Sequence, residues 1–184
     1  FLIIGNINSV SYKEVFPYIM NNKMWIGLSI SSGDRKFFVP DDYPLNASGC
    51  GVDSDGKRYI RVKGVRWFTN LDISKRNEEM DLVCRYSPEE YPSYVNYQAI
   101  DVSKTADIPF DYTGLMGVPI TFLDKYCPNQ FEIIGHSLEL ADMNIIKKEL
   151  GKLNGGPRFY VREHGQLYRK FERIIIRNKH PQIL

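Results

Sequence analysis

The sequence predicts an α/β fold: the later part of a doubly wound, Rossmann-like sheet, followed by an irregular β-rich part. Two observations lead to this prediction. The chain opens on an apolar run at residues 1–4, and Ser11 with Glu14 three residues later is a typical helix start. A second apolar run follows at residues 24–28, so that strand, helix of roughly three turns and strand succeed one another, as in a doubly wound sheet.

The first strand also bears on domain organisation. A natural chain does not usually begin inside a core strand, and Phe1 is not an initiator methionine. We therefore expect the chain to be the later part of a larger α/β protein. Residues 1–30 would be the last units of its α/β core and residues 31–184 a β-rich part, either separate from that core or forming one continuous domain with it.

Turn residues and alternation predict the next elements. Residues 31–56 are rich in Gly, Ser, Asp and Pro, which indicates a long loop with a short strand at 36–39. Gly64 separates two further strands, 58–63 and 65–71. The first of them alternates apolar with basic residues, so we expect a hairpin with one apolar and one basic face.

The second half of the chain is expected to mix strands with one helix. The Tyr- and Pro-rich stretch 88–97 predicts a surface connection without regular structure. A strand is expected at 131–135 and a helix at 138–150. The tail is expected to form two strands, 158–162 and 168–177, joined by a tight turn.

Composition restricts the function classes. With 184 residues, of which 43% are hydrophobic, the chain can bury the core of one domain. No run approaches the ~20 apolar residues of a membrane span, and no signal-peptide pattern is present. The three cysteines, Cys50, Cys84 and Cys127, are isolated in the sequence, which argues for reduced thiols in a cytoplasmic protein. None of the three histidines, His136, His164 and His180, has a carboxylate or cysteine at metal-binding spacing.

The net charge of +2 conceals an asymmetry. Between Lys147 and Lys179 ten basic residues face three acids, a local charge of +7 that leaves about −5 for the rest of the chain. A basic end suits a partner that carries phosphates. A solvated outer strand explains the charge equally well, with apolar neighbours such as Phe171 anchoring the strand.

Four blocks of the sequence, taken in order, are similar to one family. The first covers residues 5–17 (GNINSVSYKEVFP), and the others are 65–71 (VRWFTNL), 116–126 (MGVPITFLDKY) and 131–135 (FEIIG). Each block is a short aliphatic and aromatic run, but four in the same order are hard to obtain by accident. On these blocks the chain resembles the EcoRI-type adenine-specific DNA methyltransferases over nearly its whole length.

The resemblance implies an enzyme that uses S-adenosylmethionine to methylate adenine in double-stranded DNA, with base flipping, in a bacterial restriction-modification system. The Asp/Asn-Pro-Pro-aromatic catalytic motif of such enzymes would lie upstream of Phe1. This chain has no Pro-Pro dipeptide, and its Gly49-Cys50-Gly51 has no strand before it and no helix after it. We therefore expect no catalytic residue and no primary cofactor loop in this chain, which alone should be inactive.

Asn6 and Asn8 flank the expected active site. They follow the first strand, at the edge where ligands bind α/β sheets, and their amides could hydrogen-bond a base edge or the cofactor. Asn beside Gly is also an ordinary loop former, so that a purely structural role stays open.

The DNA-binding candidates come from two segments. Arg66, Trp67 and Phe68 combine a cation with two ring faces, and Arg169 and Lys170 belong to the basic tail. Because neighbouring strand residues face opposite ways, at most one of the two rings is available to DNA.

Pro119, Thr121 and Phe122 are the candidates on the substrate side, because they belong to the most distinctive of the similar blocks. Simple packing explains these residues equally well. Two other functions also stay open: a non-catalytic DNA-binding module, whose parent gene would lack the catalytic motif, and an interaction domain without a nucleic-acid role, which would show no salt-dependent DNA binding.

Overall fold

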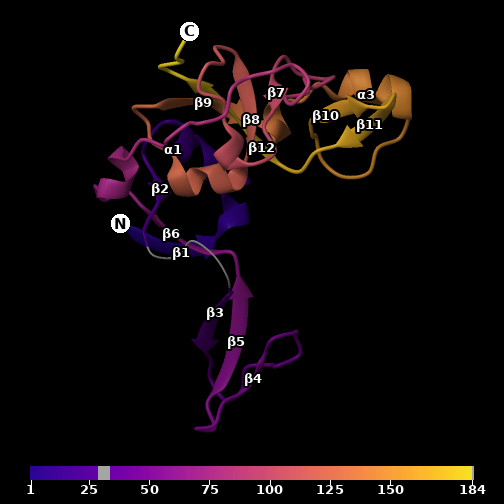
Figure 1. Cartoon of the computed structure of the whole chain (residues 1–184). Helices are drawn as coiled ribbons and strands as arrows, with labels where there is room; N and C mark the ends of the chain where they lie inside the picture. Colours follow the sequence, from indigo (N-terminus) through magenta and orange to yellow (C-terminus); the bar gives the residue numbers. More distant parts are fainter. Residues whose placement is uncertain (29–33, 184) are drawn as a thin grey trace.

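The computed structural model describes residues 1–28 and 34–183, which form a mixed α/β fold of several small sheets and few helices (Figure 1). The largest sheet has the order β7 (Ile100–Asp101), β8 (Leu115–Pro119), β12 (Arg173–Asn178) and β9 (Phe131–His136). Its central strand β12 carries three consecutive buried isoleucines, because other elements cover both faces of the sheet there. The strand predicted at 131–135 is thereby confirmed.

The first sheet has the order β1 (Leu2–Asn6), β6 (Val65–Thr69) and β2 (Trp25–Ile26). β1 and β2 are both antiparallel to β6, and therefore parallel to each other. The two strands predicted near the start of the chain are confirmed, but β6 lies between them. Among the described residues these strands do not join a larger doubly wound sheet.

Two predictions about the first elements were wrong. The apolar run expected to be a buried strand is exposed: Phe1, Leu2, Ile3 and Ile4 are between 51% and 57% exposed, because β1 is an edge strand. The three-turn helix is replaced by the 3₁₀ helix η1 (Ile7–Ser11) and the five-residue α1 (Phe16–Met20). Pro17 accounts for the break, since proline is tolerated in the first turn of a helix and not in its interior.

A three-stranded sheet projects from the body of the molecule (Figure 1). This arm consists of β3 (Asp34–Phe38), β5 (Arg58–Lys63) and β4 (Gly51–Val52), and none of residues 34–63 is buried. The hairpin predicted from 58–63 and 65–71 was wrong, because β5 pairs within the arm and β6 within the body. Gly64 allows this change of direction by adopting a φ of +69°. Residues 31–33 of the predicted loop lie outside the described residues.

The second half departs from prediction in two places. The helix expected at 138–150 is divided into α2 (Ser137–Leu140) and α3 (Met143–Leu150), because Asp142 caps α3 by accepting a hydrogen bond from Asn144 N at 2.9 Å. The tail forms β10 (Tyr160–Glu163), β11 (Gln166–Arg169) and β12. The second predicted strand, 168–177, is therefore interrupted at residues 170–172. Residues 88–97 form an irregular connection, as predicted, but it does not stay on the surface, because Tyr91, Tyr94 and Asn96 are buried.

The remaining elements are the 3₁₀ helices η2 (Ser74–Asn77), η3 (Thr105–Asp107) and η4 (Ile120–Lys125). Among residues 1–28 and 34–183, no helix is long and apolar enough to cross a membrane, and no cluster of His, Cys, Asp or Glu could hold a metal ion. The three cysteines carry free thiols.

One hydrophobic core connects the first sheet, α1 and the largest sheet. Its buried members include Phe16, Ile19, Phe68, Met116, Phe122, Phe131, Ile174 and Ile176. A buried ion pair reinforces the connection between β6 and η4: Arg66 donates to both carboxylate oxygens of Asp124, from Nε at 2.8 Å and from Nη2 at 2.9 Å. Since Arg66 is only 4% exposed, this pair is part of the core and holds η4 against the first sheet.

Replacing Arg66 by Ala is expected to lower the free energy of unfolding by about 3 kcal/mol, because Asp124 would keep a mostly buried charge without its partner. Replacing Arg66 by Met and Asp124 by Leu together should recover most of this loss, since no unpaired charge remains. Urea denaturation measures both effects. An equal loss in the single and double variants would contradict the assignment.

Candidate functional site

An open pocket of about 590 Å³ lies just past the carboxyl end of β1. Its walls come from segments that are far apart in the sequence: η1 and the residue after it, the junction of β8 with η4, and the segment that leads into β12. The lining residues are Asn8, Ser11, Tyr12, Ser103, Pro119, Ile120, Arg158, Phe171, Glu172 and Arg173. Of the predicted site residues, the pocket thus brings together Asn8 and Pro119.

Asn6 and Asn8 have different roles. The Asn6 side chain accepts a hydrogen bond from Asn8 N at 2.9 Å and donates to Lys63 O at 2.8 Å, so it shapes the start of η1. The Asn8 side chain makes no hydrogen bond to any described residue, and it lines the pocket. Of the two predicted amides, therefore, Asn8 is the one available to a ligand.

Two exposed aromatic rings line the same pocket. Tyr12 is 58% exposed and Phe171 is 88% exposed. The expectation that Phe171 anchors a strand was wrong, because residues 170–172 lie between β11 and β12. A phenylalanine left in water forgoes about 2 kcal/mol of burial free energy, so its display beside this pocket indicates a ligand surface.

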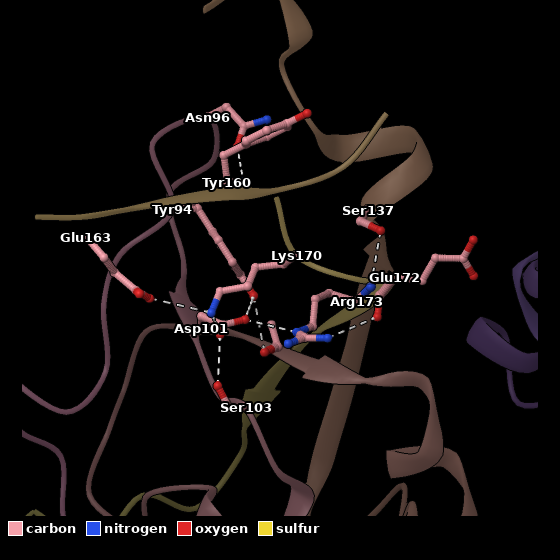
Figure 2. Close-up of polar contacts among 11 residues, drawn as sticks. Tyr94, Asn96, Asp101, Ser103, Ser137, Tyr160, Glu163, Lys170, Glu172 and Arg173 are labelled. Carbon is pink, nitrogen blue, oxygen red and sulfur yellow. Dashed lines mark hydrogen bonds and ion pairs between the residues drawn. The ribbon is translucent and has the colours of Figure 1, made fainter. Parts of the chain in front are cut away.

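A buried carboxylate holds the segment that displays Phe171. Figure 2 shows Asp101 among the side chains of Tyr94, Ser103, Lys170 and Arg173. Asp101 accepts hydrogen bonds from Tyr94 Oη at 2.6 Å, Arg173 Nε at 2.9 Å and Ser103 Oγ at 3.2 Å, and its Oδ2 lies 3.1 Å from Lys170 Nζ. Since Lys170 and Arg173 stand on either side of Phe171 and Glu172, the network fixes both ends of this short segment.

The charges of the network follow from its surroundings. Burial raises the pKa of Asp101, but the nearby Arg173, the Tyr94 hydroxyl and Lys170 together outweigh burial, so the pKa lies below its ordinary value. Burial, and next to it the Asp101 carboxylate, raise the pKa of Tyr94 well above its ordinary value. Asp101 is therefore an anion and Tyr94 a neutral donor at neutral pH.

His136 lies behind the pocket wall. It is buried, and its Nδ1 accepts a hydrogen bond from Leu138 N at 3.2 Å. Its Nε2 is 3.9 Å from Oε2 of Glu172. The other carboxylate oxygen of Glu172, Oε1, accepts a hydrogen bond from Arg158. Burial lowers the pKa of His136 to about 4; Glu172 opposes this shift and Arg158 adds to it. The imidazole is thus neutral at pH 7, with its proton on Nε2.

A second hollow, of about 610 Å³, adjoins the pocket. Ser103 and Pro119 line both spaces. The other residues around the second hollow are Lys75, Lys104, Thr105, Thr121, Asp124 and Lys125. Thr121, a predicted substrate-side residue, is therefore exposed in this hollow, whereas Phe122 is fully buried in the core and lines neither space.

The predicted DNA-binding residues are mostly engaged within the chain. Arg66 is buried against Asp124, Phe68 is buried in the core and Trp67 is half-buried, as expected for alternating strand residues. Lys170 pairs with Asp101, so that its charge is used internally. Arg169 stays exposed and donates to Gly156 O at 3.0 Å.

The sequence did not indicate several residues of the site. Phe171 was expected to anchor a strand, and neither Tyr12 nor Asp101 was singled out as a site residue. The three lysines of the second hollow lie in separate segments outside the basic tail. Only the tertiary fold brings these residues together, and no local sequence pattern indicates that they are neighbours.

Comparison with known proteins gives consistent matches. The family described as "Adenine-specific methyltransferase EcoRI" matches residues 1–179. The chain is 49% identical over 136 residues to the type II methyltransferase M.EcoRI of Escherichia coli, covering 73% of this chain and 42% of that protein. It is 38% identical over 138 residues to M.MgeORF184P of Mycoplasma genitalium and 36% identical over 138 residues to M.MpnI of Mycoplasma pneumoniae, again covering 73% of this chain and 43% of each relative.

The chain thus spans less than half the length of the curated relatives that it matches. No solved structure matches it significantly.

The buried imidazole predicts a pH dependence of stability. Because the pKa of His136 is about 4 in the folded protein and near 6.5 in the unfolded chain, the unfolded chain binds more protons between these values. The free energy of unfolding should therefore fall as the pH drops from 6.5 to 4, by about 3 kcal/mol in total. Urea denaturation across this range measures the loss.

The matched variant is His136→Asn, which keeps a side-chain acceptor for Leu138 N and removes the titrating ring. Its stability should depend much less on pH in this window. Asp101 stabilises the fold throughout this window, because its pKa is lowered from 3.8. Its contribution to stability is lost only when the pH falls further. The same slope in parent and variant would show that another group is responsible.

Proposed function

The chain belongs to the EcoRI family of adenine-specific methyltransferases, and from this premise we propose that it is the C-terminal portion of an S-adenosylmethionine-dependent DNA adenine N6-methyltransferase of a restriction-modification system. The observation that carries the proposal is the pocket past β1, where Asn8 meets the exposed rings of Tyr12 and Phe171. Its natural ligand is an adenine flipped out of duplex DNA.

The chemistry of the pocket suits an extruded base. Enzymes that modify a base within a duplex hold the flipped base by stacking and by hydrogen bonds to its Watson–Crick edge. The rings of Tyr12 and Phe171 offer stacking surfaces, which are worth about 1–3 kcal/mol per base. The Asn8 amide combines one acceptor with two donors, which matches the amino group and ring nitrogen of adenine.

The described residues do not fit the cofactor in the same way. A nucleotide-like cofactor is usually held where a glycine-rich turn joins a strand to a helix. Here Gly49 and Gly51 belong to the projecting arm, next to β4 and away from α1. S-adenosylmethionine would therefore be held mainly by other parts of the whole protein, and this chain would supply the target-base side of the active site.

The exposed edge of β1 supports a doubly wound sheet in the whole protein. Leu2, Ile3 and Ile4 are exposed on both faces of this strand, and its outer edge has no hydrogen-bonded neighbour among the described strands. Such an apolar edge promotes association unless another strand covers it. We place a further parallel strand of the methyltransferase sheet there, with antiparallel β6 near the sheet's end, as many α/β sheets allow.

The arm suits the role of a target-recognition part. It has no buried residue of its own and extends away from the body (Figure 1). Its strands carry exposed cations, and Lys36 Nζ lies 4.4 Å from the ring centre of Tyr59. A two-stranded ribbon such as β3 with β5 fits the DNA major groove. We therefore assign sequence recognition to this arm in preference to Arg66, whose guanidinium is committed to Asp124.

Replacing Phe171 by Ala in the whole protein is expected to lower kcat/KM for methylation of genomic DNA by about 10- to 100-fold, because a stacking surface is removed. The melting temperature should stay within a degree or two, since the ring packs against little. Transfer of a radiolabelled methyl group to adenine N6 measures the rate. Tyr168→Ala is the control, because Tyr168 is an exposed ring on β11 outside the pocket.

Equal rates for parent, Phe171→Ala and Tyr168→Ala would reject this pocket as the base site. A parent protein that methylates no DNA would reject the proposed activity itself.

Residues 1–184 alone are expected to bind S-adenosylmethionine weakly or not at all in a calorimetric titration, because residues 1–28 and 34–183 contain no strand–glycine turn–helix unit for the cofactor. Isothermal titration calorimetry tests this directly. Micromolar affinity would place the primary cofactor site within this chain and overturn the division of roles proposed above.

A further inference from the structure

The second hollow has the composition of an anion site. Lys75 from η2, Lys104 before η3 and Lys125 at the end of η4 line one space of about 610 Å³. The hydroxyls of Thr105 and Thr121 line the same space and make no hydrogen bond to the other described residues. Ammonium groups and hydroxyls are donors, and donors gathered in one concave space suit a group that only accepts.

The lysines of the hollow are not neutralised from within. None of Lys75, Lys104 and Lys125 forms an ion pair with a carboxylate of the described residues. The carboxylate of Asp124 also lines the hollow, but Arg66 occupies both of its oxygens. Three like charges around one hollow raise the local positive potential and attract a multiply charged anion.

We propose that this hollow binds the phosphodiester backbone of duplex DNA next to the flipped base. The inference rests on the proposed function, because it takes the adjoining pocket as the base site. Ser103 and Pro119 form the boundary between the two spaces, so that a nucleotide with its base in the first would place its own or a neighbouring phosphate toward the second. The base and its backbone would then be held by separate walls.

The position of the hollow explains why lysines are suited to it. Phosphate contacts fix the register of a protein on DNA and carry no sequence information. A lysine acts on phosphate as a point charge on a flexible stem, and it therefore tolerates the movement of a backbone from which a base is being extruded. The buried pair of Arg66 with Asp124 holds η4, and with it Lys125 and Thr121, in place during that movement.

The test is a variant of the whole protein in which Lys75, Lys104 and Lys125 are all replaced by Gln. Binding to a labelled random-sequence duplex is measured between 50 and 300 mM KCl, a range in which phosphate contacts dominate. We expect an affinity at least about tenfold lower at low salt and a salt dependence of log K smaller by about two to three units, one for each phosphate that is no longer neutralised. Cognate and non-cognate duplexes should be weakened alike.

The control variant replaces Lys147, Lys148 and Lys152 by Gln. These lysines belong to the basic end but line neither the pocket nor the hollow; they are exposed on α3 and just after it, and their removal changes the net charge by the same amount. The control should keep the parent's affinity and salt slope. Equal reductions of affinity in the two variants would show a general charge effect and overturn the proposal, as would an unchanged salt slope in the Lys75, Lys104 and Lys125 variant.

The melting temperature of each variant shows whether it is folded. If the hollow instead serves a free phosphate-bearing molecule, duplex binding would be unchanged while inorganic phosphate raised the melting temperature of the parent alone, which also overturns the proposal. If the parent protein neither binds nor methylates DNA, the proposed function fails first. If the parent protein binds and methylates DNA, and the Lys75, Lys104 and Lys125 variant has the same affinity and salt slope, only the proposed phosphate site is refuted.

Discussion

The geometry of the site depends on one buried carboxylate. Moving a charge out of water costs several kcal/mol, and Asp101 is tolerated because four neighbours satisfy it. These neighbours come from the segments on either side of β7, from the segment after β11 and from β12, so the same interactions that satisfy the charge also join distant parts of the chain. Without Asp101, Arg173 would lose its carboxylate partner and Lys170 would keep only Glu163, 3.8 Å away, so residues 170–172 would lose their buried anchor.

The network also explains how a phenylalanine can be displayed in water. An exposed ring on a mobile loop would fold back onto the nearest apolar surface. Phe171 is instead carried by residues whose side chains are committed inward: Lys170 and Arg173 bind Asp101, and Glu172 binds Arg158. The cost of exposing the ring is offset by ion pairs beneath it, as is typical of binding surfaces that are shaped before the ligand arrives.

Local elements could be predicted from the sequence where local rules decide them. β9, the strands of the first sheet and the irregular stretch 88–97 follow from short apolar runs and from proline content. The exposure of β1, the departure of β5 into the arm and the break at residues 170–172 could not be predicted in this way. Each depends on tertiary contacts that the local sequence does not encode. Gly64 turns the chain between β5 and β6, and Asp101 binds Lys170 at the break, about 70 residues further along the chain. For the same reason Asn8 could be predicted as a site residue from its place after the first strand, whereas Phe171 could not.

Arg66 illustrates why residue type alone is a weak guide to function. Arg66 stands beside two aromatic residues in a strand, a pattern shared by nucleic-acid surfaces and by protein cores. What decides between them is whether a carboxylate reaches the guanidinium, and Asp124 lies 58 residues away in sequence. The pairing removes Arg66 from the surface and also neutralises the acid that would otherwise weaken the positive potential of the neighbouring lysines. A single buried pair thereby supports the core and leaves Lys75, Lys104 and Lys125 as the dominant charges of the hollow.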